Sequence, residues 1–282
     1  MTNISVDLTG KIDGPRLDTL QRLSRTAIAL DIPLMLIGAL ARDLLLELAH
    51  GIPGGRATED IDVAVAVDSW AAYNRLKTKL ITGEGFQASV GQQQRIVFDA
   101  LQVDIVPFGP IETPEGEISW PPDNDVVMRV IGFEDVYENA VSIKLDQKFF
   151  IKSASLAGLV VLKLIAWRDR RQEKDAHDIT VIARNYLDAG NHTRWVTELP
   201  ELLEGDEFDH ESAGARLVGK DMAGIVKLPA RRYLNQLLAT ELDKSGDLAL
   251  VQSRARSLPG KAEPLESAMR LLSEIATGLH TE

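Results

Sequence analysis

Two aspartates one residue apart, Asp60 and Asp62, lie in a short run of alternating apolar and polar residues and could bind a metal ion. Successive side chains of a strand point to opposite faces, so both carboxylates would share one face while Ile61 and Val63 point into the core. Carboxylates held this close repel each other, and a hard cation such as Mg²⁺ relieves that repulsion. An isolated Asp-x-Asp is equally compatible with a turn cap beside a solvated side chain. The motif therefore needs support from its surroundings.

The segment upstream supplies a phosphate-binding geometry. Residues 33–37 form an apolar run of strand length, Gly38-Ala39 is a tight break, and residues 40–49 carry apolar side chains at helical spacing. A strand, a small-residue turn and a helix start leave backbone N–H groups without intrahelical partners. These groups would suit a phosphate.

A third carboxylate follows in the order that such a metal site would need. Asp104 lies on a short alternating run preceded by residues 95–98, with Asp99-Ala100 as the turn between two paired strands. Asp104 alone would be an ordinary surface residue of a strand. Together with Asp60 and Asp62 it becomes a candidate metal ligand.

This order resembles the nucleotidyltransferase superfold of the polymerase-beta type, in which Gly-Gly or Gly-Ser, a helix, Asp-x-Asp and a later carboxylate follow one another. Here the small pair is Gly38-Ala39. The alanine keeps the backbone donors and removes any hydroxyl contact.

An apolar helix expected from residue 156 onward contains one lysine, Lys163. Such a lysine either extends its ammonium to solvent or directs it at an anion. Shortly after it, Asp175 and Asp178 lie one helical turn apart on the same side of a second expected helix.

With these residues included, the chain resembles the AbiEii/AbiGii-type (MenT-like) nucleotidyltransferase toxins over residues 30–187. The matching motifs are Gly38-Ala39, Arg56-x-Thr58-x-Asp60-x-Asp62, Asp104, Lys163 and Lys174-Asp175-x-x-Asp178.

The resemblance implies roles for these residues. The metal ligands would be Asp60, Asp62 and Asp104. The residues at the nucleotide would be Gly38, Ala39, Arg42, Thr58 and Lys163. Lys163 would neutralise the leaving pyrophosphate, and Asp175 would orient Lys163 or act as a base, with Asp178 as the alternative. Arg42 could instead simply pair with Asp43 or Glu47.

The implied activity is Mg²⁺-dependent transfer of a nucleotide from an NTP to an acceptor hydroxyl. The expected acceptor is RNA, in particular tRNA, and the expected partner is a cognate antitoxin. Two alternatives stay open: transfer to a small molecule, as in antibiotic-modifying nucleotidyltransferases, and nucleotide binding without turnover.

The composition and charge of the chain limit the kinds of binding partner and metal site that can be expected. The 282 residues carry a net charge of −11 and no cysteine. The negative charge argues against indiscriminate nucleic-acid binding, and the absence of cysteine excludes disulfides and thiolate metal sites. No apolar run is long enough to span a bilayer and no targeting segment is visible, so we expect a cytoplasmic protein without a membrane partner.

The pattern predicts an α/β (α+β) nucleotidyltransferase domain with a mixed sheet over residues 1–154, followed by a mostly helical domain over residues 155–282 that completes the active site. Helices are expected at 17–30 and 69–81, and a hairpin at 141–152.

Three further expectations concern residues outside these motifs. A proline-rich loop is expected over residues 107–122. Trp70 and Trp120 are expected to pack in the core, although Trp120 lies where that loop could border the site. The histidines show no metal-ligand spacing in the sequence; they include His50, His177, His192 and His210.

Overall fold

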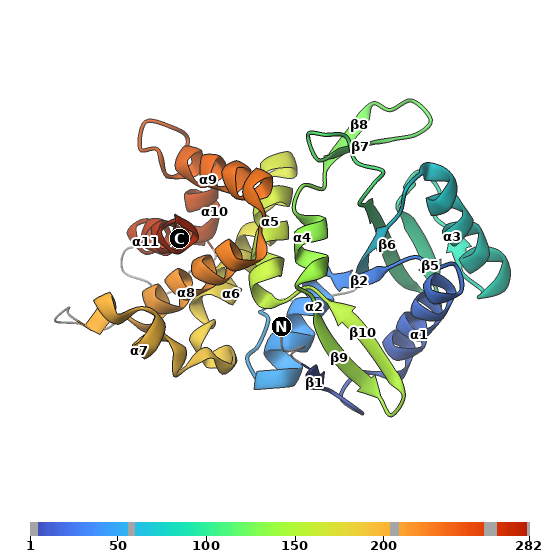
Figure 1. Cartoon of the computed structure of the whole chain (residues 1–282), viewed down its shortest axis with the longest axis horizontal. Helices are drawn as coiled ribbons and strands as arrows, with labels where there is room; N and C mark the ends of the chain where they lie inside the picture. The colour runs from blue at the N-terminus through green and yellow to red at the C-terminus, as the bar shows by residue number, and fades with distance from the viewer. Residues whose placement is uncertain (1–4, 56–59, 204–208, 257–263, 281–282) are drawn as a thin grey trace. The chain divides into compact units, whose positions relative to one another are not determined.

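The structure, a computed structural model, describes residues 5–55, 60–203, 209–256 and 264–280 (Figure 1). It divides into two compact units. The first comprises residues 1–49 and 56–155, and the second comprises residues 50–55 and 156–282. Residues 50–55, expected in the first half, belong to the second unit, where the carbonyl oxygen of Gly54 lies 3.1 Å from His177 Nε2.

The first unit is built on a mixed eight-stranded sheet, in the order β1-β9-β10-β2-β3-β6-β5-β4. Strands β1 and β9, β10 and β2, and β3 and β6 pair in parallel, and the other neighbours are antiparallel. The strands are β1 (Ser5–Asp7), β2 (Leu34–Ile37), β3 (Asp60–Ala66), β4 (Gln87–Ala88), β5 (Arg95–Phe98), β6 (Leu101–Phe108), β9 (Val141–Asp146) and β10 (Phe149–Ser153).

The centre of this sheet is apolar because β3 and β6 contribute fully buried branched side chains. These include Ile61, Val63, Val103 and Ile105. Burial of such side chains is the main stabilising contribution to a core of this kind. The polar residues that alternate with Ile61 and Val103 are thereby held on a rigid support.

Several helical segments accompany the sheet, four of them before residue 84. They are α1 (Gly14–Ala29), α2 (Gly38–Asp43), which continues into the π-helix η1 (Leu44–Leu48), and α3 (Trp70–Gly83). The helix expected at 69–81 is present as α3, and Ser69 caps its start, since Ser69 Oγ accepts a hydrogen bond from the Ala72 backbone N–H. The predicted hairpin at 141–152 is confirmed as β9 and β10.

The expected proline-rich loop is partly wrong. Pro107 lies inside β6, opposite Val65, and residues further along form a separate hairpin of β7 (Glu117–Trp120) and β8 (Val126–Arg129), followed by α4 (Phe133–Glu138). Proline can occupy a strand where its missing N–H is not needed for pairing. The proline content of this segment therefore led to the prediction of a loop where β7 and β8 form a hairpin.

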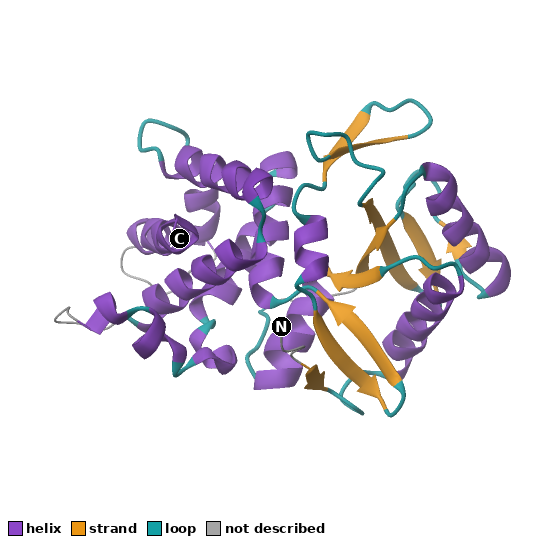
Figure 2. Cartoon of the chain, in the orientation of Figure 1, coloured by secondary structure: helices purple, strands orange, loops and turns teal. Residues whose placement is uncertain are grey.

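In the second unit, the described residues form helices and connecting loops, with no strand among them (Figure 2). The elements are α5 (Leu156–Arg170), α6 (Glu173–Arg184), η2 (Leu187–Asn191), α7 (Arg194–Glu198), η3 (Pro200–Leu203), α8 (His210–Ile225), α9 (Leu228–Leu242), α10 (Ala249–Arg256) and α11 (Pro264–His280). The predicted fold class, a mixed α/β portion followed by a helical one, is confirmed. No helix in the part of the chain that the structure describes is long and apolar enough to cross a membrane.

One buried cation in this unit has few partners. Arg254 of α10 is fully buried, and its Nε donates to Thr180 Oγ1 at 3.0 Å. Among the described residues, its Nη1 and Nη2 atoms have no hydrogen-bond partner. Burial lowers the pKa of Arg254 to about 9, since removal from water disfavours the charged form.

Candidate active site

Strand register brings the three predicted metal ligands together on one face of the sheet. In the parallel pair β3 and β6, Asp62 is directly opposite Asp104, and Asp60 is opposite Gln102. Residues two apart on a strand share a face, so the three carboxylates form a compact group. We call Asp60, Asp62 and Asp104 the acid cluster.

An arginine that the sequence analysis did not identify lies beside the acid cluster. Arg95 of β5 donates from Nε and Nη2 to the two carboxylate oxygens of Asp104, both at 2.7 Å. Its Nη2 also lies 3.3 Å from Asp60 Oδ2, and its Nη1 donates to Gln102 Oε1. The hydrogen bonds to Asp104, followed by the negative charges of Asp104, Asp60 and Asp62, raise the pKa of Arg95. Arg95 therefore already neutralises part of the acid cluster.

The hairpin turn between β5 and β6 could have identified Arg95. Asp99 and Ala100 both have positive φ, 48° and 66°, as in a two-residue type I′ turn. Such a turn pairs Phe98 with Leu101, and counting back along both strands places Arg95 opposite Asp104. The position of Arg95 beside Asp104 thus follows from the register that the predicted turn imposes.

Gly38 and Asp62 are in close contact at the start of α2. Gly38 has φ +73°, a conformation that favours glycine, and it follows the Ile37 end of β2, which is paired with Asp62. A Cβ atom at position 38 would lie 2.1 Å from Asp62 Oδ2. The glycine is thus required both by its backbone conformation and by the carboxylate beside it.

The remaining residues predicted near the nucleotide have different surroundings. Ala39 is buried. Arg42 is also buried, and its Nε and Nη2 atoms donate to Asp43 Oδ1 at 2.8 and 2.6 Å. Pairing with Asp43, one of the two alternatives for Arg42, is therefore present, and phosphate binding by Arg42 stays a prediction. Thr58 lies outside the described residues.

In the second unit, Lys163 belongs to a group of paired charges, in which Lys163, Asp175 and Asp178 are buried and Arg170 is exposed. Its Nζ lies 2.7 Å from Asp178 Oδ2 and 3.3 Å from Asp175 Oδ1. Arg170 donates from Nε and Nη2 to the same Asp175 carboxylate, at 2.8 and 2.7 Å. We call Lys163, Arg170, Asp175 and Asp178 the paired-charge cluster.

This cluster decides between the two readings of Lys163. The lysine side chain is only 10% exposed, and those of Asp175 and Asp178 are 0% and 1% exposed. The ammonium therefore does not extend to bulk solvent; it is directed at anions within the protein. Asp175 and Asp178, the two alternatives for the last carboxylate of the motif, both contact this ammonium. Their spacing of one helical turn allows both to pair with Lys163.

The prediction about histidine spacing needs a correction. His192 and His210, which are far apart in sequence, lie close to Asp188 in the second unit, with ligand atoms of all three within 4.8 Å of one another. A helix kink and a helix start bring them together, and sequence spacing cannot reveal that.

A pocket of about 340 Å³ lies beside α3 in the first unit. Its lining includes Trp70, Tyr73, Asn74, Lys77, Gln93, Pro121 and Pro122. Trp120 is buried against Trp70 and Tyr73, with ring centroids 5.1 and 5.8 Å away, as expected for packing residues. The Tyr73 hydroxyl donates to the Ile105 carbonyl at 3.0 Å, and burial, with the nearby charge of Asp104, raises the pKa of Tyr73 well above its usual range.

Comparison with protein families gives one match, a model described as nucleotidyl transferase AbiEii toxin, type IV toxin–antitoxin system, over residues 21–243. The match includes both the acid cluster and the paired-charge cluster. No curated protein matches the chain.

Two solved structures show distant similarity. The solution structure of the antibiotic-resistance factor ANT(2'')-Ia is 12% identical, covers 69% of this chain and 100% of its own, and has a TM-score of 0.37. A CCA-adding enzyme in complex with ATP is 15% identical, covers 93% of this chain and 68% of its own, and has a TM-score of 0.27. These scores are too low to carry an argument.

Proposed function

Because the chain belongs to the AbiEii nucleotidyl transferase toxin family, and is thus a nucleotidyltransferase, we propose that it transfers a nucleotide from an NTP to a hydroxyl group of RNA in a Mg²⁺-dependent reaction. The acceptor to test first is tRNA. The observation that carries this proposal is the register that gathers Asp60, Asp62 and Asp104 on one face of a rigid sheet.

The donor set of the acid cluster fits Mg²⁺. Magnesium takes oxygen ligands and is usually held by one or two carboxylates, with substrate phosphates and water completing the shell. The three aspartates and Arg95 together have a formal charge of −2, and the Asp60 side chain is 38% exposed. Asp60 and Asp62 would be the principal ligands, and Asp104 would join them to the extent that it leaves Arg95. When bound, Mg²⁺ would supply positive charge at the reacting phosphate and at the attacking hydroxyl.

The protein's own contribution would be to position groups and neutralise charge, which supply most of the rate in phosphoryl transfer. Gly38 keeps the start of α2 close to Asp62, so backbone N–H groups of Gly38 and Ala39 would face the triphosphate near the metal ligands. Arg95 would hold Asp104 in place until a cation competes for it.

Lys163 is proposed to contact the phosphates and neutralise the leaving pyrophosphate. Asp175 and Asp178 would set the position of its ammonium. Both oxygens of Asp175 already accept hydrogen bonds, from Lys163 and Arg170, which favours an orienting role over that of a general base.

A cognate antitoxin is the proposed partner, since the family model describes the toxin of a type IV toxin–antitoxin system. Co-expression with the product of an adjacent gene should relieve growth inhibition by the wild-type chain if this is correct.

The test of the activity is transfer from each of the four α-³²P-labelled NTPs into total RNA, with Asp62→Ala as the control. We expect label in RNA of tRNA size with the wild type and none with the variant. Label in the small-molecule fraction would instead support an antibiotic-type enzyme. Bound NTP without transfer to any acceptor would support nucleotide binding alone, and equal labelling by both proteins would refute the proposal.

A further inference from the structure

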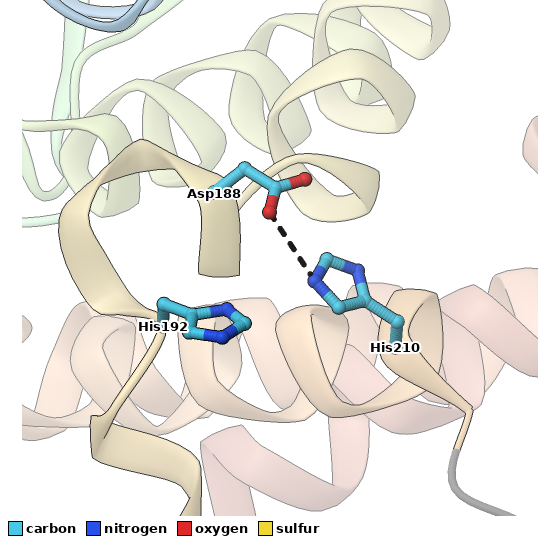
Figure 3. A group of neighbouring side chains, drawn as sticks. All are labelled: Asp188, His192 and His210. Atoms are coloured by element: carbon cyan, nitrogen blue, oxygen red, sulfur yellow. Dashed lines mark ion pairs between the residues drawn. The ribbon is translucent and has the colours of Figure 1, made fainter.

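Two histidines and an aspartate gather in the second unit, apart from the residues proposed above for catalysis. Ligand atoms of Asp188, His192 and His210 all lie within 4.8 Å of one another. His210 Nε2 is 3.3 Å from Asp188 Oδ1, and the two imidazole ring centroids are 6.3 Å apart. Figure 3 shows the three side chains directed toward a common space.

The chain reaches this arrangement through a kink. Asp188 lies in η2, where Ala189 and Gly190 leave helical geometry; Gly190 has φ +84° and ψ 7°. This left-handed residue turns the chain, so that His192 returns to the same side as Asp188. The third group, His210, is the first residue of α8, whose start is fixed by the Asp209 side chain accepting the Glu211 N–H.

The donor set fits a borderline divalent cation. Imidazole nitrogens and a carboxylate oxygen are ligands that Zn²⁺ prefers, whereas Mg²⁺ takes oxygen ligands almost exclusively. In a zinc site with bonds of about 2.0–2.2 Å, neighbouring ligand atoms lie about 3.3 Å apart. The Asp188 to His210 distance already has this value. His192, whose side chain is exposed, has a ring nitrogen within 4.8 Å of both.

Among the described residues, the arginines near the start of α8 do not oppose a cation at this place. The arginines adjacent to the start of α8 are engaged with carboxylates: Arg184 lies 2.6 Å from Glu211, and Arg270 lies 3.4 Å from Asp209. Their positive charges are therefore locally compensated. A simple ion pair between His210 and Asp188 would not require a second imidazole beside it.

We propose that Asp188, His192 and His210 form a Zn²⁺ site with three protein ligands and water in the remaining position. The ion would tie the end of η2 to the start of α8, and so close the chain between residues 192 and 210. This site is independent of the acid cluster in both position within the chain and ligand chemistry.

The experiment is calorimetric titration of the full-length protein with ZnCl₂ in the presence of excess MgCl₂, which occupies oxygen-only sites. We expect one Zn²⁺ per chain and a rise in Tm on binding. His192→Asn and Asp188→Asn should each weaken Zn²⁺ binding at least tenfold. His280→Asn, which changes an exposed histidine at the end of α11, should leave it unchanged.

A second measurement distinguishes this site from adventitious binding at the aspartates of the first unit. Cu²⁺ added as a spectroscopic probe should show nitrogen hyperfine coupling from two imidazoles in the Asp62→Ala variant as in the wild type. Loss of Zn²⁺ binding in Asp62→Ala, or wild-type binding in both His192→Asn and His210→Gln, would overturn the proposal.

Discussion

The acid cluster and the paired-charge cluster both bring aspartates next to basic side chains, but they differ in exposure and in charge balance. The acid cluster has three carboxylates with one guanidinium, that of Arg95, beside them, and these side chains are partly exposed. The paired-charge cluster has two carboxylates and two cations, and both of its carboxylates are buried. A negative, accessible group can accept a cation, whereas a buried balanced group loses stability when any member is removed. The first cluster is therefore suited to exchange partners and the second to hold a fixed geometry.

The largest effect is expected at the acid cluster, on activity alone. Asp62→Asn keeps the shape of the side chain and removes its charge, so we expect kcat/KM for nucleotide transfer to fall by at least about 10³-fold. The Tm should stay the same or rise, because one of three neighbouring negative charges is gone. Asp146→Asn, at the end of β9, is the control. A large fall in Tm for Asp62→Asn would mean that this cluster, too, is primarily structural.

The opposite result is expected at Lys163. Lys163→Met leaves the buried Asp178 and Asp175 without the ammonium between them, and should lower the free energy of unfolding by about 3–5 kcal/mol. Urea denaturation measures this change. The double variant Lys163→Met, Asp178→Asn removes the uncompensated charge and should recover part of the loss. A single variant as stable as the wild type would show that the cluster is not held by its charge balance.

Gly38→Ala tests the contact between the start of α2 and the acid cluster. The left-handed backbone alone should lower the free energy of unfolding by about 1–2 kcal/mol. The collision with Asp62 Oδ2 should add to this loss and reduce nucleotide transfer. Gly10→Ala is a matched control, since Gly10 has φ +76° and a Cβ there would meet no atom within 4 Å. Thermal unfolding and transfer should be measured together, and equal behaviour of the two variants would contradict the proposed contact.

Arg254 extends the comparison within the second unit, because among the described residues this buried cation has no ion pair of the kind that Lys163 makes with Asp175 and Asp178. Replacing it with methionine should raise the free energy of unfolding by about 1–3 kcal/mol at pH 7. The pKa of Arg254, about 9, lies below the usual range of arginine, so the folded protein loses this proton before the unfolded chain does as the pH rises. The free energy of unfolding of the wild type therefore increases above pH 9. The advantage of Arg254→Met should therefore shrink between pH 8 and pH 10.5. Arg256→Met, at an exposed site, is the control; an advantage that does not depend on pH would contradict this account.

The smallest effect is expected at Arg95. Arg95→Met removes the cation that competes for Asp104, and Mg²⁺ affinity should increase by about tenfold, or about 1.4 kcal/mol. Calorimetric titration with MgCl₂ measures this change, with Arg16→Met as the control for loss of a positive charge elsewhere in the same unit. Weaker Mg²⁺ binding by Arg95→Met would mean that Arg95 supports the metal site instead of competing with it.

Much of the first unit could be predicted because its signals are local. The alternation around Asp60 and the turn at Asp99-Ala100 each depend on neighbours in the sequence, and both are present as strands and a hairpin. Together with the order of the motifs they predicted a family that the match over residues 21–243 confirms. The position of Arg95 opposite Asp104 could also have been predicted, from the register that the turn at Asp99-Ala100 imposes.

The side-chain clusters of the second unit were harder to predict, because residues far apart in the sequence come together only when the helices pack. Helical spacing placed Asp175 and Asp178 on one side, but nothing local indicated that Lys163 would contact both. The approach of His192 to His210 depends on a kink at Gly190 and on where α8 begins. The spacing of the histidines in the sequence predicts neither the kink nor the start of α8.

The two-residue turn at Asp99-Ala100 has a consequence for how this family can vary. Inserting a single residue there would shift β5 by one position against β6 and move Arg95 to the opposite face of the sheet. The charge beside the acid cluster would change by one unit although every aspartate stayed in place. Insertions and deletions in this loop would therefore change the electrostatics around these aspartates in related proteins without substituting any of them.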